Sequence, residues 1–188
     1  MRKVIAAINM TLDGYCDHTA INPDEEIHQH YTNLLNNSDT ILYGRITFGL
    51  MGYWQTFIKT PSGEPAMDDF GNAIDRIEKI VFSHTLKAID WDSAALARRP
   101  LEEEVLDLRQ QSGADILVGS RSIIIQLLKL NLIAEFQLCI HPVVVGSGLP
   151  LFNEIGDRTT LELIETKRFP SGAIILYYKP QLQANTFS

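Results

Sequence analysis

The sequence has few cysteines, no long apolar run and no excess of positive charge. Its 188 residues include two cysteines, Cys16 and Cys139, without CxxC spacing, so buried thiols are expected rather than a disulfide framework. No stretch approaches the ~18 uninterrupted apolar residues of a membrane span, and the apolar run near the N-terminus is too short for a signal peptide. With 16 Lys and Arg against 23 Asp and Glu, the net charge of -7 argues against a nucleic-acid partner. A cytoplasmic location, with neither membrane nor nucleic acid as partner, is expected.

Several catalytic and binding motifs are also absent. GxGxxG does not follow the first predicted strand, where Asn9-Met10-Thr11 stands instead, and there is no GxxxxGK[ST] loop, so an NTPase is not expected. The sequence has no GxSxG and no H-x-E with P-C-x-x-C, the zinc signature of the deaminases. The five histidines are scattered without the spacing of metal ligands, and no metal site is expected.

What the sequence does contain is an alternation of short apolar segments with amphipathic ones. With 45% hydrophobic and 21% charged residues, the chain can bury one sizeable core. Apolar runs typical of buried strands cover residues 4–8, 40–43, 79–83 and 116–118. Three further β-compatible runs follow without helices between them, at residues 136–145, 161–169 and 173–178, and Pro170-Ser171-Gly172 joins the last two.

Helical patterns separate the first strands. One helical face is marked by four apolar residues, Ile27, Tyr31, Leu34 and Leu35. Further helices are expected to begin near Arg45, to include residues 67–77, to follow Pro100, and to cover residues 122–130. Residues 55–65 contain two prolines and a glycine and are expected to form an exposed loop.

Alternating strands and helices imply a mainly parallel sheet, and the β-rich C-terminal part implies antiparallel strands added to it. We therefore expect a single α/β domain over residues 1–180, followed by a tail at residues 181–188. The sheet should be mixed, mainly parallel and flanked by helices.

Ligands of such sheets bind beyond the carboxyl ends of the strands, so the turns that follow the strands are candidate sites. Three of them are rich in glycine, hydroxyl and basic residues: Gly44-Arg45-Ile46-Thr47, Ser83-His84-Thr85 and Gly119-Ser120-Arg121-Ser122. Helix N-termini, hydroxyls and arginines bind anions, so the three turns together suit a ligand with several phosphates, such as a dinucleotide. The alternative for each turn is helix capping.

Six motifs occur in order over nearly the whole chain: VIAAI, LDG, TILYGRITF, KIVFSHTL, ADILVGSRSIIIQLL and AEFQLCIHPVVVGSGLPLF. This order resembles the dihydrofolate-reductase-like superfamily, most closely the branch similar to the C-terminal reductase domain of bacterial riboflavin-synthesis enzymes. The resemblance implies a sheet of about eight strands with NADPH held across its carboxyl edge.

The resemblance also implies a set of cofactor-binding residues. Ala7 would lie against the nicotinamide, and Gly44, Arg45 and Thr47 match a GRxT phosphate-binding turn, with Arg45 near the adenosine 2′-phosphate.

Two further turns complete that set. Ser83 and His84 fall where polar contacts reach the same end of the cofactor. The turn that receives the pyrophosphate is matched by Gly119, Ser120, Arg121 and Ser122. Ser120 departs from the usual Gly-Gly pair, which adds a Cβ where the backbone must approach the ligand closely.

On the substrate side, dihydrofolate reductases place a carboxylate on the first helix, and the matching position here is His28. Asp13 lies in a turn similar to the SxDG turn of the riboflavin-type reductases, where it would face the substrate and could deliver a proton, a role that bound water could also fill. Its alternative is a simple Asp-Gly turn. Trp54 could stack on a planar heterocycle or serve as a core aromatic.

These features predict an NADPH-dependent reductase of a small nitrogen heterocycle, similar to the 5-amino-6-(5-phosphoribosylamino)uracil reductase of riboflavin biosynthesis. Two alternatives are a dihydrofolate reductase and a non-catalytic nucleotide-binding or assembly protein with the same fold. The resemblance also implies a homodimer, for which the apolar stretch at residues 136–152 is either an interface or a core strand.

Overall fold

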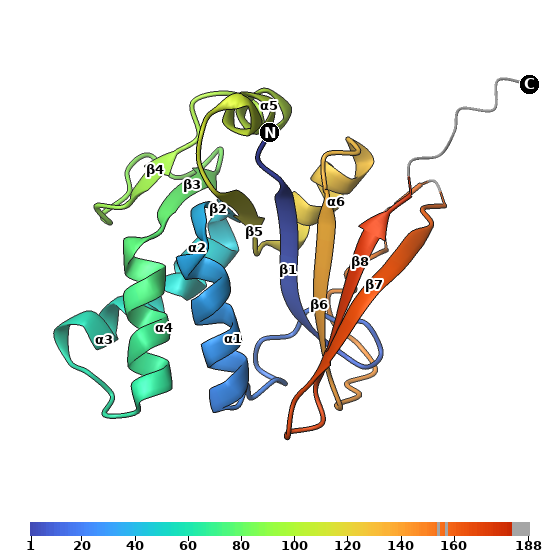
Figure 1. The fold of residues 1–188 in the computed structure, drawn as a ribbon. Helices are drawn as coiled ribbons and strands as arrows, with labels where there is room; N and C mark the ends of the chain where they lie inside the picture. The colour runs from blue at the N-terminus through green and yellow to red at the C-terminus, as the bar shows by residue number, and fades with distance from the viewer. Residues whose placement is uncertain (154, 157, 182–188) are drawn as a thin grey trace, which may run out of the picture.

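Eight strands form one sheet in the order β4-β3-β2-β5-β1-β6-β8-β7 (Figure 1). The computed structural model describes residues 1–153, 155–156 and 158–181. The strands are β1 (Val4–Thr11), β2 (Ser38–Gly44), β3 (Glu78–Phe82), β4 (Ala94–Leu96), β5 (Asp115–Val118), β6 (Glu135–His141), β7 (Leu161–Arg168) and β8 (Ile174–Pro180). The pairs among β1 to β6 are parallel, whereas β8 runs antiparallel to β6 and β7 antiparallel to β8. The expected mixed, mainly parallel sheet with antiparallel C-terminal strands is confirmed.

The helices carry local signals that fix where they begin. They are α1 (Glu25–Asn36), α2 (Arg45–Met51), the 3₁₀ helix η1 (Gly52–Trp54), α3 (Gln55–Lys59), α4 (Pro65–Arg76), α5 (Leu101–Gln110) and α6 (Arg121–Lys129). Asp24 caps α1 by accepting the Ile27 N–H at 2.9 Å. Pro65 begins α4, and α5 follows Pro100 with three glutamates in its first turn, where acidic residues are stabilised by the helix dipole.

Alternate residues of the buried strands face opposite layers of helices. On β1, Val4 and Ala6 belong to the same core cluster as residues of α5 and α6. Ile5 points to the other face and shares a cluster with Leu35 of α1 and Ile74 of α4, which Figure 1 shows side by side. A third cluster packs Ile27 of α1 against β6 and β8. The result is a sheet between two helical layers, with α1 next to β1.

Two expectations about local structure are corrected, and one strand is found that the sequence did not predict. Residues 55–59 are the helix α3 rather than part of an exposed loop, because α2, η1 and α3 follow one another without interruption and Phe57 packs on Trp54. The short edge strand β4 has only three residues and gives no sequence signal. The strand expected to reach residue 145 ends at His141, since Pro142 has no N–H to donate to a ladder.

The C-terminal tail, the possibility of a membrane-spanning helix and the two cysteines were also subjects of the sequence predictions. The predicted tail at residues 181–188 lies, except for Gln181, outside the described residues. Within the described ranges, none of the helices has the length and apolar character needed to span a membrane. Both cysteines are free, and Cys139 is buried whereas Cys16 is half-buried.

Candidate active site

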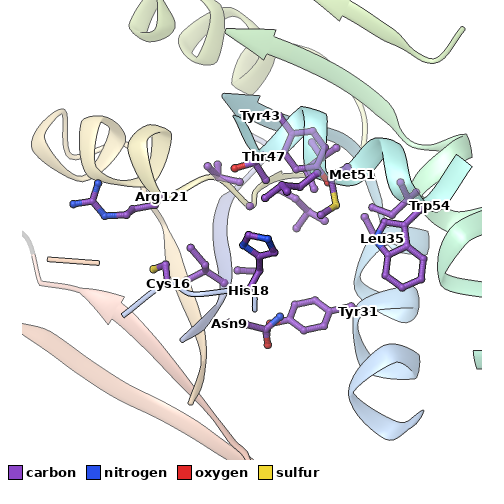
Figure 2. A pocket seen from close by; sticks show the side chains of 18 of the residues that line it. Asn9, Cys16, His18, Tyr31, Leu35, Tyr43, Thr47, Met51, Trp54 and Arg121 are labelled. Atoms are coloured by element: carbon purple, nitrogen blue, oxygen red, sulfur yellow. The ribbon is translucent and has the colours of Figure 1, made fainter. Parts of the chain in front are cut away.

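A cavity of about 890 Å³ opens at the carboxyl edge of the sheet, on the face covered by α1 and α4. Its floor is formed by the ends of β1, β2 and β5, which are neighbours in the sheet. Residues of α1, α2, η1 and α4 form one wall, and the loop after β1 contributes Cys16, His18, Ile21 and Pro23 (Figure 2). The cavity therefore lies where ligands bind in open α/β sheets.

The turns after β2 and β5 interlock at one end of this cavity. The Ser120 side chain is buried, and its Oγ accepts the backbone N–H of Gly44 at 2.9 Å. A Cβ at Gly44 would lie 3.1 Å from the Ser122 Oγ, and one at Gly119 would lie 3.3 Å from the Tyr43 ring. The two turns therefore approach each other closely at both glycines, and the Ser120 hydroxyl joins them.

This end fits the dinucleotide that the family resemblance implies. The turns at Gly44 and Gly119 form a cradle of closely packed backbone, and Gly119 lines the cavity. The adjoining helix α6 begins at Arg121, where the first N–H groups have no partner within their own helix. Ala7, Thr47 and Ser122 line the cavity, with Ala7 on the strand beside Gly119. Residues of the expected cofactor set therefore meet around one end of the cavity.

Other members of that set are placed differently. The Arg121 guanidinium binds the Pro150 carbonyl through Nε at 2.6 Å and the Asn153 Oδ1 through Nη2, and Figure 2 shows it pointing away from the other labelled side chains. This engagement does not favour direct contact of its guanidinium with the pyrophosphate. Arg45 is exposed at the start of α2, on the surface beside the cavity rather than in its lining.

The turn after β3 lies outside the cavity lining. Its Ser83 Oγ accepts the backbone N–H groups of Thr85 at 3.2 Å and Leu86 at 3.0 Å. His84 is exposed. The β3 turn shares the sheet edge with the turns of β2 and β5, as expected, but its serine hydroxyl stabilises the turn itself.

The Asp13 side chain connects the loop after β1 to the loop after β6 by hydrogen bonds. Its carboxylate accepts the Gly146 N–H at 2.7 Å, the Val145 N–H at 3.1 Å and the Thr11 hydroxyl at 2.6 Å. These hydrogen bonds, led by that of Thr11, lower the pKa of Asp13. The carboxylate is exposed and does not line the cavity, so its position does not favour the expected roles of substrate contact and proton donor.

His28 and Trp54 line the wall of the cavity opposite the sheet. The Trp54 ring packs edge-on against Phe70 at a centroid distance of 4.6 Å, and His28 lies 5.7 Å from Trp54 and 5.8 Å from Phe70. Burial lowers the pKa of His28, so its imidazole is neutral at pH 7. Trp54 is therefore both part of an aromatic cluster and part of the cavity wall.

Sequence reasoning missed a polar group in the same cavity. The Asn9 Oδ1 accepts the Tyr31 hydroxyl at 3.2 Å and lies 2.9 Å from His141 Nε2, and Figure 2 shows Asn9 and Tyr31 pointing toward one another. Asn9 and Tyr31 both line the cavity, whereas His141 is buried on β6. The one available signal was the polar residue Asn9 within an otherwise apolar strand.

The lining of the cavity carries very few charged side chains. Among the described residues, the lining contains no Asp, Glu or Lys, and its single arginine is Arg121. The same described ranges bring no three His, Cys, Asp or Glu residues together around a possible metal position. Aliphatic and aromatic side chains dominate, so the cavity suits a flat, largely apolar ligand.

Comparisons with known proteins agree with this architecture. The chain is 35% identical over 185 residues to the uncharacterized protein YyaP of Bacillus subtilis, a match that covers 94% of each chain. A putative riboflavin biosynthesis protein from Shewanella has a similar fold, with a TM-score of 0.70 and 19% identity over 95% of this chain and 99% of its own. A pyrimidine reductase-like protein from Corynebacterium diphtheriae gives a TM-score of 0.61 at 16% identity, covering 96% of this chain and 92% of its own.

The family follows from the sequence as well as from the fold. The expected family was the riboflavin-type reductase branch, and residues 2–175 match the model of a family described as the RibD C-terminal domain. The chain belongs to the RibD C-terminal domain family, whose fold is that of the dihydrofolate reductases.

Proposed function

We propose that the protein is an NADPH-dependent reductase of a small, planar nitrogen heterocycle. The observation that carries the proposal is the glycine cradle of the turns after β2 and β5, whose Gly119 lines an apolar cavity next to Ala7. Membership of a family that typically uses NAD(P)H supports it. The finer assignment, a reductase similar to the 5-amino-6-(5-phosphoribosylamino)uracil reductase, is part of the proposal.

The protein's contribution is orientation and exclusion of water. Bound NADPH supplies a hydride, and the reduction of a C=N bond is completed by one proton on nitrogen. The turns at Gly44 and Gly119 hold the cofactor, while Trp54 and His28 form the wall that positions the heterocycle. Such positioning is a large part of catalysis when the cofactor carries the chemistry.

The proton comes from bound water in this proposal. Asp13 is the other group considered for this step, but its carboxylate is held by Val145, Gly146 and Thr11 and has a lowered pKa. A carboxylate that is ionised and outside the cavity cannot donate a proton there at neutral pH.

Two alternative functions are less well supported. A dihydrofolate reductase is disfavoured because, within the described residues, no carboxylate lines the cavity, and His28 lies at the wall where that family places one. A non-catalytic nucleotide-binding or assembly protein would leave the open, aromatic-walled half of the cavity without a purpose. That alternative predicts NADPH binding without oxidation in the presence of any pterin, pyrimidine or flavin precursor.

The expected homodimer is also proposed, with its location revised. β6 is an interior strand, and Phe136 and Leu138 are buried, so the first half of the stretch at residues 136–152 belongs to the core. The edge strand β7 instead exposes Leu163 and Ile164, at 51% and 56%. An exposed edge strand offers unpaired N–H and C=O groups to another chain, and we place the dimer contact at β7, where Leu163 and Ile164 lie beside charged residues of the same strand.

The test of the cofactor is a fluorescence titration with NADPH and NADH. Removal of Arg45, whose guanidinium is expected near the 2′-phosphate, should weaken NADPH binding by about 10- to 100-fold, the value of one to two charge-assisted hydrogen bonds, and leave NADH binding unchanged. The matched control is Arg76→Ala, at the C-terminal end of α4 and away from this edge. Equal affinity of the wild type for both cofactors would contradict the assignment of Arg45.

A further inference from the structure

The most constrained polar group in the cavity is the carboxamide of Asn9. Asn9 lies two residues after Ala7 on β1, so both side chains point to the same face of the sheet, and both line the cavity. At about 3.3 Å per strand residue, Asn9 stands roughly 7 Å beyond the position expected for the nicotinamide. It therefore belongs to the part of the cavity that a substrate would fill.

Two partners from different elements hold the oxygen of this carboxamide. The Tyr31 hydroxyl on α1 donates to Oδ1 at 3.2 Å, and His141 Nε2 on β6 lies 2.9 Å from the same oxygen. Burial lowers the pKa of His141, so its ring is neutral at pH 7 and carries one proton. That proton is on Nε2, because a nitrogen that faces a carbonyl oxygen at this distance must be the donor.

The charged group that acts on this triad is the Asp24 carboxylate at the N-terminus of α1, which interacts electrostatically with His141 and Cys139. Cys139 Sγ lies 3.6 Å from His141 Nε2, and burial raises the pKa of its thiol to about 12, so the thiol stays protonated. With Oδ1 occupied by Tyr31 and His141, the Asn9 amide nitrogen retains two N–H groups as donors, and Asn9 lines the cavity.

The rest of the lining limits what this donor can bind. No Asp, Glu or Lys from the described part of the chain reaches the cavity surface, and the Arg121 guanidinium is already bound to Pro150 and Asn153. A buried phosphate or a cationic ring would therefore have no charged partner in this half of the cavity. Burial of an unpaired charge is strongly unfavourable.

We infer that Asn9 determines substrate specificity, donating its amide N–H to a carbonyl oxygen or unprotonated ring nitrogen of an uncharged, non-phosphorylated heterocycle. Tyr31 and His141 are positioning residues that fix the amide orientation. The inference rests on the proposed reductase function but departs from its finer assignment, since it excludes a phosphate-bearing pyrimidine from this half of the cavity and favours a non-phosphorylated relative of that substrate.

The experiment compares 5-amino-6-ribosylaminouracil with its 5′-phosphate, each titrated calorimetrically into the complex of the protein with NADP⁺. The wild type should bind the non-phosphorylated compound more tightly. Asn9→Ala should weaken that binding by about 10-fold or more, because a lost hydrogen bond leaves the uracil carbonyl buried and unpaired. Asn9→Asp should weaken it further, since a carboxylate cannot donate to a carbonyl.

Matched variants separate recognition from folding. Asn33→Ala removes an exposed asparagine on α1 and should leave binding unchanged. Tyr31→Phe keeps the ring but frees the carboxamide, and should weaken binding of the heterocycle by a few-fold while NADP⁺ affinity stays constant. A structural defect would instead lower both affinities together.

The outcomes distinguish the two proposals. If the wild type binds neither NADPH nor NADP⁺, the reductase proposal fails before Asn9 is tested, and titration of the heterocycle into the free protein then decides the role of Asn9. If the cofactor binds but Asn9→Ala binds the uracil as the wild type does, the role of Asn9 is overturned alone. Tighter binding of the 5′-phosphate, or no binding of either compound, overturns the substrate class.

Discussion

The two ends of the cavity offer a ligand different kinds of protein group. At the end formed by the turns after β2 and β5, the protein offers backbone groups and two glycines, Gly44 and Gly119, joined through Ser120. At the other end, the surface consists of side chains: the Trp54 ring, the neutral His28 and the carboxamide of Asn9. Backbone recognition suits a constant cofactor, whereas side-chain recognition can change with the substrate.

The difference also appears in how each end is held together. The cofactor end depends on the close approach of two adjacent turns, so added volume there acts directly on the binding surface. The substrate end depends on hydrogen bonds and ring contacts between α1, β1 and β6, so it responds to the loss of individual groups. Substitutions should therefore affect one end without the other.

The largest effect is expected from Gly119→Val. A Cβ at this position lies 3.3 Å from the Tyr43 ring, and the two additional methyl groups would force the turns after β2 and β5 apart. Overpacking of this kind costs about 1–3 kcal/mol, which should appear as a loss of NADPH affinity of roughly 10- to 100-fold. Fluorescence titration measures the affinity, and circular dichroism verifies that the variant is folded.

The control for this prediction is Gly49→Ala, on the helix that follows the first of these turns. A Cβ at Gly49 meets nothing within 4 Å, and alanine is a better helix former than glycine. NADPH affinity should equal that of the wild type. A similar loss in both variants would show that the cofactor end responds to general destabilisation and not to closure of the cradle.

A smaller effect is expected at the other end, from Trp54→Phe. The smaller ring covers less of a planar heterocycle, and an aromatic contact is worth about 0.5–1.5 kcal/mol, so the KM of the heterocycle should rise by roughly 2- to 10-fold. NADPH affinity should not change, because Trp54 is on η1, beyond the cradle. Steady-state kinetics with each substrate varied in turn measures both values.

Phe57→Leu tests whether the Trp54 effect comes from ring contact or from packing. Phe57 lies 5.6 Å from Trp54 in the same aromatic cluster but outside the cavity lining. This variant should lower the thermal stability and leave KM unchanged. An equal rise of KM in both variants would mean that Trp54 serves the core alone, the alternative considered from the sequence.

The cofactor end could be predicted from the sequence because its signals are local. Glycines and hydroxyls that directly follow apolar strand segments, as at Gly44 and Gly119, mark turns at the carboxyl edge. The element order was predictable for the same reason, since each strand and helix carries its own periodicity. Local signals could not show that the Arg121 guanidinium turns to Pro150, because that contact depends on how a distant loop folds back.

The substrate end could not be predicted because its partners are distant along the chain. Asn9 and His141 are separated by 132 residues and meet only because β1 and β6 pair in one register, Thr11 beside His141. The helical continuation through α3 was missed because the two prolines of residues 55–65 lie beyond its end, at positions 61 and 65. The hydrogen bonds of Asp13 could not be predicted for the same reason, because its partners Val145 and Gly146 are equally remote along the chain.

The smallest predicted effect is a loss of stability at acidic pH. It should weaken ligand binding at the substrate end of the cavity before it weakens binding at the cofactor end. Three histidines on the substrate side, His28, His30 and His141, have lowered pKa values because of burial, and that of His30 falls to about 4. A histidine that stays neutral in the folded protein binds fewer protons than it does in the unfolded chain. The contribution of these neutral histidines to the free energy of unfolding is therefore fully present above about pH 6.5, and it decreases as the pH falls from about 6.5 toward 4.

His30→Phe should make this pH dependence shallower. The phenylalanine ring can keep the contacts of His30 with Tyr31, Phe169 and Tyr177, at centroid distances of 5.4, 6.1 and 6.5 Å, but it has no proton to gain. Between pH 7 and pH 5 the melting temperature should fall by a few degrees less than in the wild type, as thermal denaturation at a series of pH values would measure. Because His28 and His30 lie on α1 and His141 lies on β6, acid should raise the dissociation constant of the heterocycle before that of NADPH. If the dissociation constants of both ligands rose equally at acidic pH, the two ends of the cavity would form one cooperative unit. They would then differ only in the groups that line them.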